Sequence, residues 1–430
     1  VDEMKAIARN RYLDKLIALR DTDVIKIVTG MRRCGKSTLL DMMRSYLADE
    51  GIPAERLLTF KMESFDLEGM RDWRELYRYV VDRMPEQGRC YIFFDELQEV
   101  IGWERTINAL RVDRDCDIYV TGSNAFLLSS EIATLISGRY VEITMHPLSF
   151  SEYVDFHGPT DITKGFAVFN QEKIIPLDDL LDDYMKFGGL PYLAVSELPE
   201  QVMKDYILST YRTIISRDIL ARDARRGRYT VTDADLLNRV SAYLSDNISN
   251  LTSTNKIVGT LNDEGTKISR NSISAYMAAL EETYIFSHVR RFDIKGRDVL
   301  KTGGKYYIED LGIRSFLDGY RGSDSGRILE NAVYNRLVFD GYRVFTGHLR
   351  GGEIDFVAIG DGSDRKFIQV TESIDVEATR ERELRPLELK SLEKTAAGYE
   401  KVLVVRRGGH PTDIDGIRII SAVDFLMGRY

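Results

Sequence analysis

The chain has 430 residues, of which 43% are hydrophobic and 30% are charged. At roughly 150 residues per domain, this length suggests about three domains and excludes a single small module. Acidic residues outnumber basic ones by 68 to 59, and the net charge of −9 excludes a uniformly basic protein that coats nucleic acid. We find no apolar run of roughly 20 residues and no signal-peptide pattern, so we expect a cytoplasmic protein without a membrane partner.

Strand and helix patterns alternate over residues 1–160. We expect strands at 24–29, 56–62, 90–94, 117–123 and 139–145, and helices at 36–51, 71–84 and 103–112. The run CYIFF at 90–94 is apolar throughout, which is typical of a parallel strand covered on both faces. This alternation predicts a doubly wound α/β domain with a parallel sheet.

The segment GMRRCGKS at 30–37 fits the phosphate-loop pattern G-x-x-x-x-G-K-[ST] at every fixed position. Glycines let backbone amides turn toward an anion, and the following helix adds the positive end of its dipole. Lys36 is expected to neutralise the β- and γ-phosphates of ATP, and the Ser37 hydroxyl to hold Mg²⁺. The predicted nucleotide-binding residues are Gly30, Arg32, Arg33, Cys34, Gly35, Lys36, Ser37 and Thr38.

Some of these residues allow other interpretations. Arg32 and Arg33 are candidates to face phosphate, DNA or a neighbouring subunit, and the sequence does not separate these roles. Cys34 is either a redox-sensitive thiol or a simple filler of the loop. The three cysteines contain no CxxC pair, so we expect no structural zinc site.

Acidic residues follow the apolar strand at 90–94. Asp95 is placed to hold Mg²⁺, and Glu96 to orient and deprotonate an attacking water. The next strand ends in TGSN, where Ser123 and Asn124 are candidates to touch the γ-phosphate or the water. We name Asn124 with Glu96 as catalytic, although Ser123 and Asn124 also suit a helix cap.

The motifs GMRRCGKSTLL, FDELQEVIGW, TGSNAFLLSSEIATLISGRY and HPLSFSEY, in that order, resemble the AAA+-type ATP-binding proteins of bacteria and archaea. FGGLPYL and TIISRDIL continue the similarity. The resemblance implies a P-loop ATPase domain at 1–160, a helical linker or lid at 161–235, a winged helix-turn-helix at 236–320, and a degenerate PD-(D/E)xK nuclease-like domain at 321–430.

The same resemblance implies an arginine finger, supplied by a neighbouring copy in many AAA+ proteins. Arg139 in SGRY and Arg217 in SRDI match the family's motif arginines. Arg139 also suits a structural ion pair at a strand start, and Arg217 a pair with the adjacent Asp218. A finger stabilises charge that develops on the transferred phosphoryl group. A homo-oligomer is therefore expected if Arg139 acts in trans.

Positive charge is concentrated in the middle of the chain. Residues 212–305 contain 16 basic and 11 acidic residues, a local net charge of +5, which leaves −14 for the remainder. A predicted hairpin, the wing, carries Arg290, Arg291, Lys295, Arg297, Lys301 and Lys305. We expect this wing to contact DNA phosphates and the helix that begins near Arg270 to enter a groove. A protein partner, or a merely solvated hairpin, is the alternative.

The C-terminal pattern resembles a metal-dependent nuclease in which carboxylates hold a cation and a lysine positions water. Glu330, Asp355 and Gln369 match the helix acid, the strand acid and the Glu/Gln positions, but Thr371 stands where the lysine is expected. We therefore predict an inactive fold that binds nucleic acid or a partner, with cleavage as the alternative.

Together these patterns predict an ATPase that couples Mg-ATP hydrolysis to conformational change on DNA. The alternative is a nucleotide-gated switch or scaffold with slow hydrolysis and a protein partner.

Overall fold

The computed structural model describes residues 7–430 with the exception of 8, 68–69, 71, 126–137, 164, 170–172, 226–230, 264–267, 295, 297, 320–323, 350–351, 375–386, 394, 396–397 and 410. The chain divides into two compact units. The N-terminal unit comprises Val1–His146 with Glu282–Tyr284, and the C-terminal unit comprises Pro147–Glu281 with Ile285–Tyr430.

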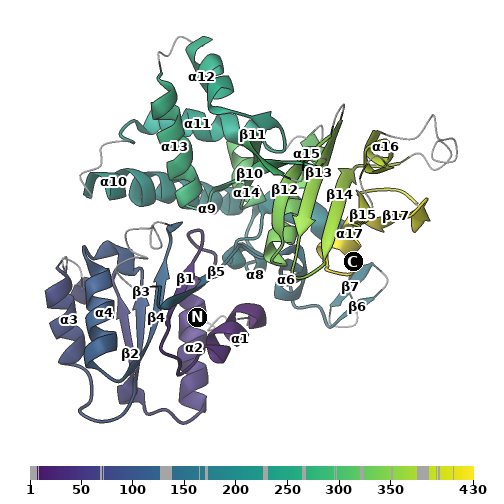
Figure 1. The fold of residues 1–430 in the computed structure, drawn as a ribbon. Coiled ribbons are helices and arrows are strands. Elements are labelled where there is room, and N and C mark those ends of the chain that lie inside the picture. Colours follow the sequence, from purple (N-terminus) through teal and green to yellow (C-terminus); the bar gives the residue numbers. More distant parts are fainter. Residues whose placement is uncertain are drawn as a thin grey trace. The chain divides into compact units, whose positions relative to one another are not determined.

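The N-terminal unit is a five-stranded parallel sheet with helices on its faces (Figure 1). Its strands are β1 (Ile25–Thr29), β2 (Leu57–Lys61), β3 (Cys90–Asp95), β4 (Cys116–Gly122) and β5 (Tyr140–Thr144), in the order β2-β3-β4-β1-β5. Its helices are α1 (Asn10–Ala18), α2 (Lys36–Asp49), α3 (Trp73–Val81) and α4 (Trp103–Asp113), with 3₁₀ turns at Ala54–Arg56, Phe65–Leu67 and Leu97–Glu99. The predicted parallel sheet is confirmed.

The strand order determines which loops meet. Because β4 lies between β1 and β3 and all three are parallel, the segments after Thr29, Asp95 and Gly122 leave the sheet at the same edge. Each of the five strands contributes apolar side chains to the buried core. At the opposite end of the sheet, Lys26 and Asp117 form an ion pair with no exposed side-chain area.

The C-terminal unit begins with helices and a small sheet. Its helices are α6 (Phe150–Phe156), α7 (Leu177–Phe187), α8 (Pro191–Val195), α9 (Glu200–Thr213), α10 (Arg222–Arg225), α11 (Ala234–Asp246), α12 (Thr254–Asp263), α13 (Arg270–Glu282), α14 (Leu311–Asp318), α15 (Ser325–Phe339), α16 (Leu387–Glu393) and α17 (Ala422–Leu426), with a π-helical segment at Ile214–Ala221. Strands β6 (Asp161–Thr163), β7 (Phe166–Phe169) and β8 (Lys173–Pro176) form an antiparallel sheet. The expected helical region at 161–235 therefore starts with strands.

The GGLP turn after α7 packs against a buried carboxylate. Asp310 is 1% exposed and accepts a hydrogen bond from the Gly189 amide at 2.8 Å. Gly188 has a φ of +79°, and a Cβ atom there would lie 2.2 Å from Asp310 Oδ1. The turn therefore needs glycine both for its backbone conformation and for its close contact.

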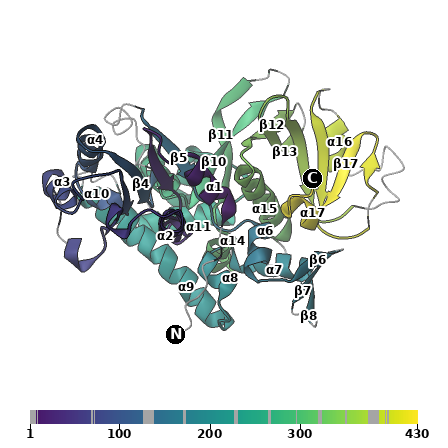
Figure 2. The ribbon, with the colours of Figure 1, turned by 90° about the horizontal axis from the view of Figure 1, so that it is seen from below.

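A nine-stranded mixed sheet forms the rest of this unit (Figures 1 and 2). Its strands are β9 (Leu251–Thr252), β10 (Phe286–Asp293), β11 (Asp298–Ile308), β12 (Arg343–Leu349), β13 (Gly352–Ile359), β14 (Arg365–Thr371), β15 (Glu400–Val405), β16 (Asp413–Ile414) and β17 (Ile417–Ser421). They follow the order β16-β17-β15-β14-β13-β12-β10-β11-β9.

The hairpin predicted as a wing is part of this sheet. Strands β10 and β11 pair antiparallel, and β10 also pairs parallel with β12, where Arg291 lies opposite Thr346. A strand at the edge of a sheet has unpaired backbone amides and carbonyls. Those of β10 form hydrogen bonds with β12. Strands from the ranges 236–320 and 321–430, which the sequence analysis treated separately, thus share one sheet. Within the described residues, no helix is long and apolar enough to cross a membrane.

Candidate functional site

The phosphate loop connects β1 to α2 at the edge where three strands end. Gly30 has a φ of +140°, and a Cβ atom there would lie 2.0 Å from the carbonyl oxygen of Met145, so no other residue fits. Lys36 is 4% exposed, and its ammonium donates to the carbonyls of Gly30 and Met31, each at 2.9 Å. The lysine thus lies across the loop that the sequence predicts to bind phosphate.

Arg9 and Met145 anchor this loop to the rest of the sheet. The Arg9 guanidinium donates to the carbonyls of Cys34 at 3.2 Å and of His146 at 2.7 Å, and it is 5% exposed. The Cys34 thiol is buried and donates to the Met145 carbonyl at 3.3 Å. Arg9 precedes every recognisable motif, and no sequence signal indicates its role.

Two hydroxyl groups donate hydrogen bonds to Asp95, the last residue of β3. Ser37 Oγ donates to Asp95 Oδ1 at 2.9 Å, and Thr121 Oγ1 donates to the same oxygen at 2.6 Å. These residues come from the start of α2, the end of β3 and the end of β4. Ser37 and Asp95, each predicted to hold Mg²⁺, thus lie within hydrogen-bonding distance of each other, and Thr121 is a third member that the sequence did not indicate.

Glu96 is held by backbone and side-chain contacts. Its φ of +56° is unusual for a residue other than glycine, and its amide donates to Thr121 Oγ1 at 3.0 Å. Ser123 Oγ donates to Glu96 Oε2 at 3.1 Å, and Gln98 Nε2 donates to the same oxygen. Gln98 was also missed, although it lies in the FDELQEV motif.

Electrostatics keep Glu96 ionised. Burial acts to raise the pKa of Glu96, but the positive charges of Lys36 and Arg32 and the hydrogen bonds from Gln98 and Ser123 outweigh it. The pKa of Glu96 therefore lies below its usual value. An ionised carboxylate at this edge of the sheet is chemically able to accept a proton from water.

Other predicted residues lie around or away from this centre. Asn124 is 3% exposed and directly follows Ser123, whereas Arg33 and Thr38 are exposed and Arg32 lies 3.5 Å from Glu63. Arg139 is exposed at the start of β5, where its carbonyl accepts a hydrogen bond from the Ile25 amide. Since β5 and β1 are parallel, Arg139 lies at the opposite sheet edge and does not join the site of its own chain.

The predicted DNA-contacting residues lie in the C-terminal unit. Arg270 at the start of α13 and Arg290 on β10 are exposed. Arg291 is half-buried and contacts the His348 ring at 2.9 Å. Lys295 and Arg297 lie outside the described residues.

The nuclease-like residues do come together. The Asp355 amide donates to Gln369 Oε1 at 3.0 Å, and Glu330 and Asp355 both face the ammonium of Lys305. Lys305, which the sequence predicts to lie on a wing, is only 4% exposed. Over the described part of the chain, no group of three or more His, Cys, Asp or Glu residues is arranged to hold a metal ion.

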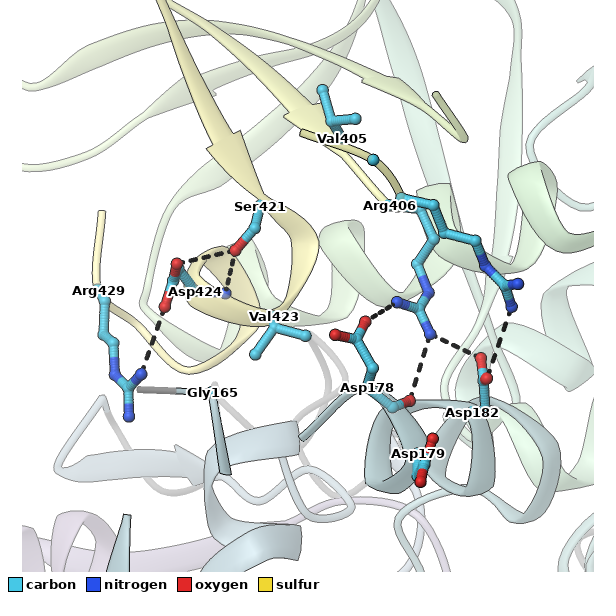
Figure 3. Close-up of a pocket in the computed structure, with 12 residues that line it drawn as sticks. Gly165, Asp178, Asp179, Asp182, Val405, Arg406, Ser421, Val423, Asp424 and Arg429 are labelled. Atoms are coloured by element: carbon cyan, nitrogen blue, oxygen red, sulfur yellow. Dashed lines mark hydrogen bonds and ion pairs between the residues drawn. The ribbon is translucent and has the colours of Figure 1, made fainter. Parts of the chain in front are cut away.

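A cavity of about 580 Å³ lies where β15 and β17 end (Figure 3). Arg406 points from the end of β15 toward α7, pairing with Asp178 and, at 2.7 Å, with Asp182. On another wall, Arg429 pairs with Asp424 at 3.3 Å. The pairs of Arg406 with Asp178 and Asp182 connect α7 to the end of β15.

Comparison with known protein families gives matches to two segments of the chain. A family model described as an AAA domain matches residues 22–154, and a domain of unknown function matches residues 178–324. An AAA domain implies nucleotide binding, usually with Mg²⁺.

Two relatives match most of the chain. An uncharacterized protein of Haemophilus influenzae is 38% identical over 423 residues, which cover 98% of each chain. An uncharacterized protein of Methanocaldococcus jannaschii is 26% identical over 397 residues, covering 88% of this chain and 84% of the relative. Among solved structures, a Walker-type ATPase of Pyrococcus abyssi aligns with 73% of this chain and 96% of its own, at 15% identity and a TM-score of 0.49.

The Thr121 hydroxyl provides the first test of the site. Thr121→Val keeps the shape but leaves the Glu96 amide without its acceptor and removes one of the two hydroxyl donors to Asp95, the other being Ser37. We expect a loss of about 1–3 kcal/mol in the free energy of unfolding, and a 10- to 100-fold weaker Mg²⁺-dependent nucleotide turnover, of the order seen when a supporting hydrogen bond is lost. Thermal denaturation and turnover assays measure both. Thr59→Val, at an exposed position on β2, is the control, and equal effects of the two variants would contradict the assignment.

Proposed function

The chain belongs to the same protein family as its Haemophilus influenzae relative, and its AAA domain leads us to propose that it binds ATP with Mg²⁺ and hydrolyses it. The observation that carries this proposal is the convergence of Ser37, Asp95 and Glu96 beside the phosphate loop, with Thr121 linking the two acids.

The residues present fit the nucleotide and the metal. Lys36 and the loop amides supply positive charge for the phosphates, and a Cβ atom at Gly30 would destroy the loop's contact with Met145. Ser37 Oγ and Asp95 Oδ1, 2.9 Å apart, are the hard oxygen ligands that Mg²⁺ prefers. When bound, Mg²⁺ would neutralise charge on the β- and γ-phosphates.

Glu96 is the base in this proposal. Ser123 and Gln98 donate to one of its carboxylate oxygens, which fixes the side chain and leaves the other oxygen to orient a water molecule and accept its proton. Its lowered pKa keeps it ionised at neutral pH. Asn124, buried next to Ser123, is the candidate to orient the γ-phosphate.

Glu96→Gln separates binding from hydrolysis. The amide keeps the shape but cannot accept the proton, so we expect turnover to fall by about 10²- to 10⁴-fold, while ATP affinity stays within about threefold. Stopped-flow binding of a fluorescent ATP analogue and phosphate release measure the two quantities. Glu99→Gln, three residues along the chain, should leave both unchanged. Undiminished turnover in Glu96→Gln would remove Glu96 from the reaction.

The position of Arg139 supports an oligomer. It is exposed and lies at the sheet edge opposite its own phosphate loop, so it does not contact the nucleotide site of its own chain. We therefore propose that Arg139 serves the site of a second copy, where it stabilises charge on the transferred phosphoryl group.

Mixing two inactive variants tests this arrangement. Arg139→Ala should lower turnover by about 10³-fold or more while preserving ATP affinity. Mixed with Glu96→Gln chains, which still supply Arg139, the Arg139→Ala chains should regain measurable turnover at their intact Glu96. Arg78→Ala, at an exposed position on α3, is the control. No recovery in the mixture at any ratio would contradict a role in trans.

DNA is the proposed target of the conformational change. Helices α11, α12 and α13 precede the β10–β11 hairpin, and exposed Arg270 and Arg290 lie on α13 and β10. This segment is part of a region with a net charge of +5 in a chain of net charge −9. Cations that neutralise phosphates release counterions, so binding should weaken as salt rises.

Charge reversal tests the DNA interface. The double variant Arg270→Glu with Arg290→Glu should weaken DNA binding and reduce the slope of log affinity against log salt by about 2, one for each lost phosphate contact. Lys173→Glu with Arg365→Glu, both exposed elsewhere in the same unit, is the matched control. Fluorescence anisotropy at several salt concentrations measures the affinity. If both double variants bind DNA like the unmodified chain, a protein partner replaces DNA in the proposal.

A further inference from the structure

Four charged side chains converge in the C-terminal unit away from the nucleotide site. The Lys305 ammonium, on β11, lies 2.9 Å from Glu330 Oε1 on α15, 2.5 Å from Glu353 Oε1 on β13 and 3.6 Å from Asp355 Oδ1 on β13. Strands β12 and β10 separate β13 from β11 in the sheet, so these residues meet through their side chains. An ammonium has three N–H donors, and here three carboxylates surround it.

The carboxylates are also held by other donors. Tyr307 Oη donates to Glu330 Oε1 at 2.6 Å, and the Val370 amide donates to Asp355 Oδ2 at 2.9 Å. Their side chains are 13% exposed in Glu330 and in Asp355, and that of Lys305 is 5% exposed. Lys305, Glu330 and Asp355 are therefore fixed and largely removed from water, whereas the Glu353 side chain is 33% exposed.

Charge balance explains why the lysine is there. Burial raises the pKa of Asp355, and the neighbouring Glu330 raises it further, because several carboxylates in one buried space repel each other. Burial alone would lower the pKa of Lys305, but the three carboxylates outweigh burial and raise it. The ammonium thus keeps its charge and offsets part of theirs.

We propose that Lys305 is the built-in counter-cation of the Glu330–Glu353–Asp355 cluster, occupying the place that a divalent metal would take among these carboxylates. The cluster then stabilises the sheet and α15 without metal, and it performs no metal-dependent phosphodiester cleavage. This inference is independent of the proposed ATPase, since all four residues lie in the C-terminal unit.

Three further observations support this assignment. Among the described residues, no group of three or more His, Cys, Asp or Glu side chains is arranged to hold a metal ion, although three carboxylates face Lys305. A phosphodiester would also need to reach the cation, and the lysine is almost completely covered. Thr371, at the position expected for a nuclease lysine, instead donates to the Ser373 carbonyl at 3.2 Å.

The test uses the full chain with Ser37→Ala, which removes one of the two proposed metal ligands of the nucleotide site. In this background, Lys305→Met leaves three carboxylates without their cation and should lower the Tm by about 5 °C or more. Adding Glu330→Gln to Lys305→Met removes one negative charge and should recover at least half of that loss. Lys256→Met, at an exposed position on α12, is the control and should change the Tm by less than about 1 °C.

Mn²⁺ binding, followed by electron paramagnetic resonance, is the second measurement. In the chain that retains Lys305, we expect Asp355→Asn to leave the amount of bound Mn²⁺ unchanged. We also expect this chain to show no Asp355-dependent cleavage of duplex or single-stranded DNA. Asp355-dependent Mn²⁺ binding or cleavage would overturn the proposal. A Tm unchanged by Lys305→Met would do so as well, as would a double variant no more stable than Lys305→Met. If Lys305→Met alone does not fold, folding of the double variant supports the proposal and its failure to fold overturns it.

Discussion

The hydroxyl of Thr121 joins the two acids of the nucleotide site. It donates to Asp95, which Ser37 also contacts, and it accepts the amide of Glu96. This is possible only because β4 lies between β1 and β3, so that the strand end carrying Thr121 falls between the phosphate loop and the acidic strand end. The strand order therefore fixes the relative positions of the metal-ligand candidate and the candidate base, and the flanking contacts of Ser123 and Gln98 depend on it.

Two buried lysines show how the same side chain acquires different roles. Lys36 donates to two neutral backbone carbonyls, so its positive charge is available to an anion. Lys305 faces three carboxylates, so its charge is balanced by the protein. Both lysines are 4% exposed, so burial does not distinguish them. Their different roles come from the charge of the groups that they contact. One lysine is suited to bind a ligand, whereas the other is suited to hold the fold together.

The sequence predicted what depends on local pattern. The apolar runs located the strands of the parallel sheet, and the glycine-lysine spacing located the phosphate loop, because both are properties of short segments. Arg9 and Thr121 were missed because their roles come from neighbours distant in the chain, such as His146 for Arg9. Gln98 was missed although its partner Glu96 is only two residues away. Lys305 was placed on a wing for the same reason: alternation in a hairpin does not reveal that a further strand, β12, covers its edge.

The pairing of β10 with β12 also determines which fragments of the chain can be expected to fold alone and which segments should be exchanged together in evolution. A fragment that ended near residue 320 would lack β12, the neighbour of β10 in the sheet. The backbone amides and carbonyls of β10 that pair with β12 would then be unpaired. Open edges of this kind promote association with other chains. The hairpin and the C-terminal strands are therefore expected to be gained, lost or exchanged together during evolution, and a fragment designed to isolate the helices α11 to α13 should extend to the end of the sheet.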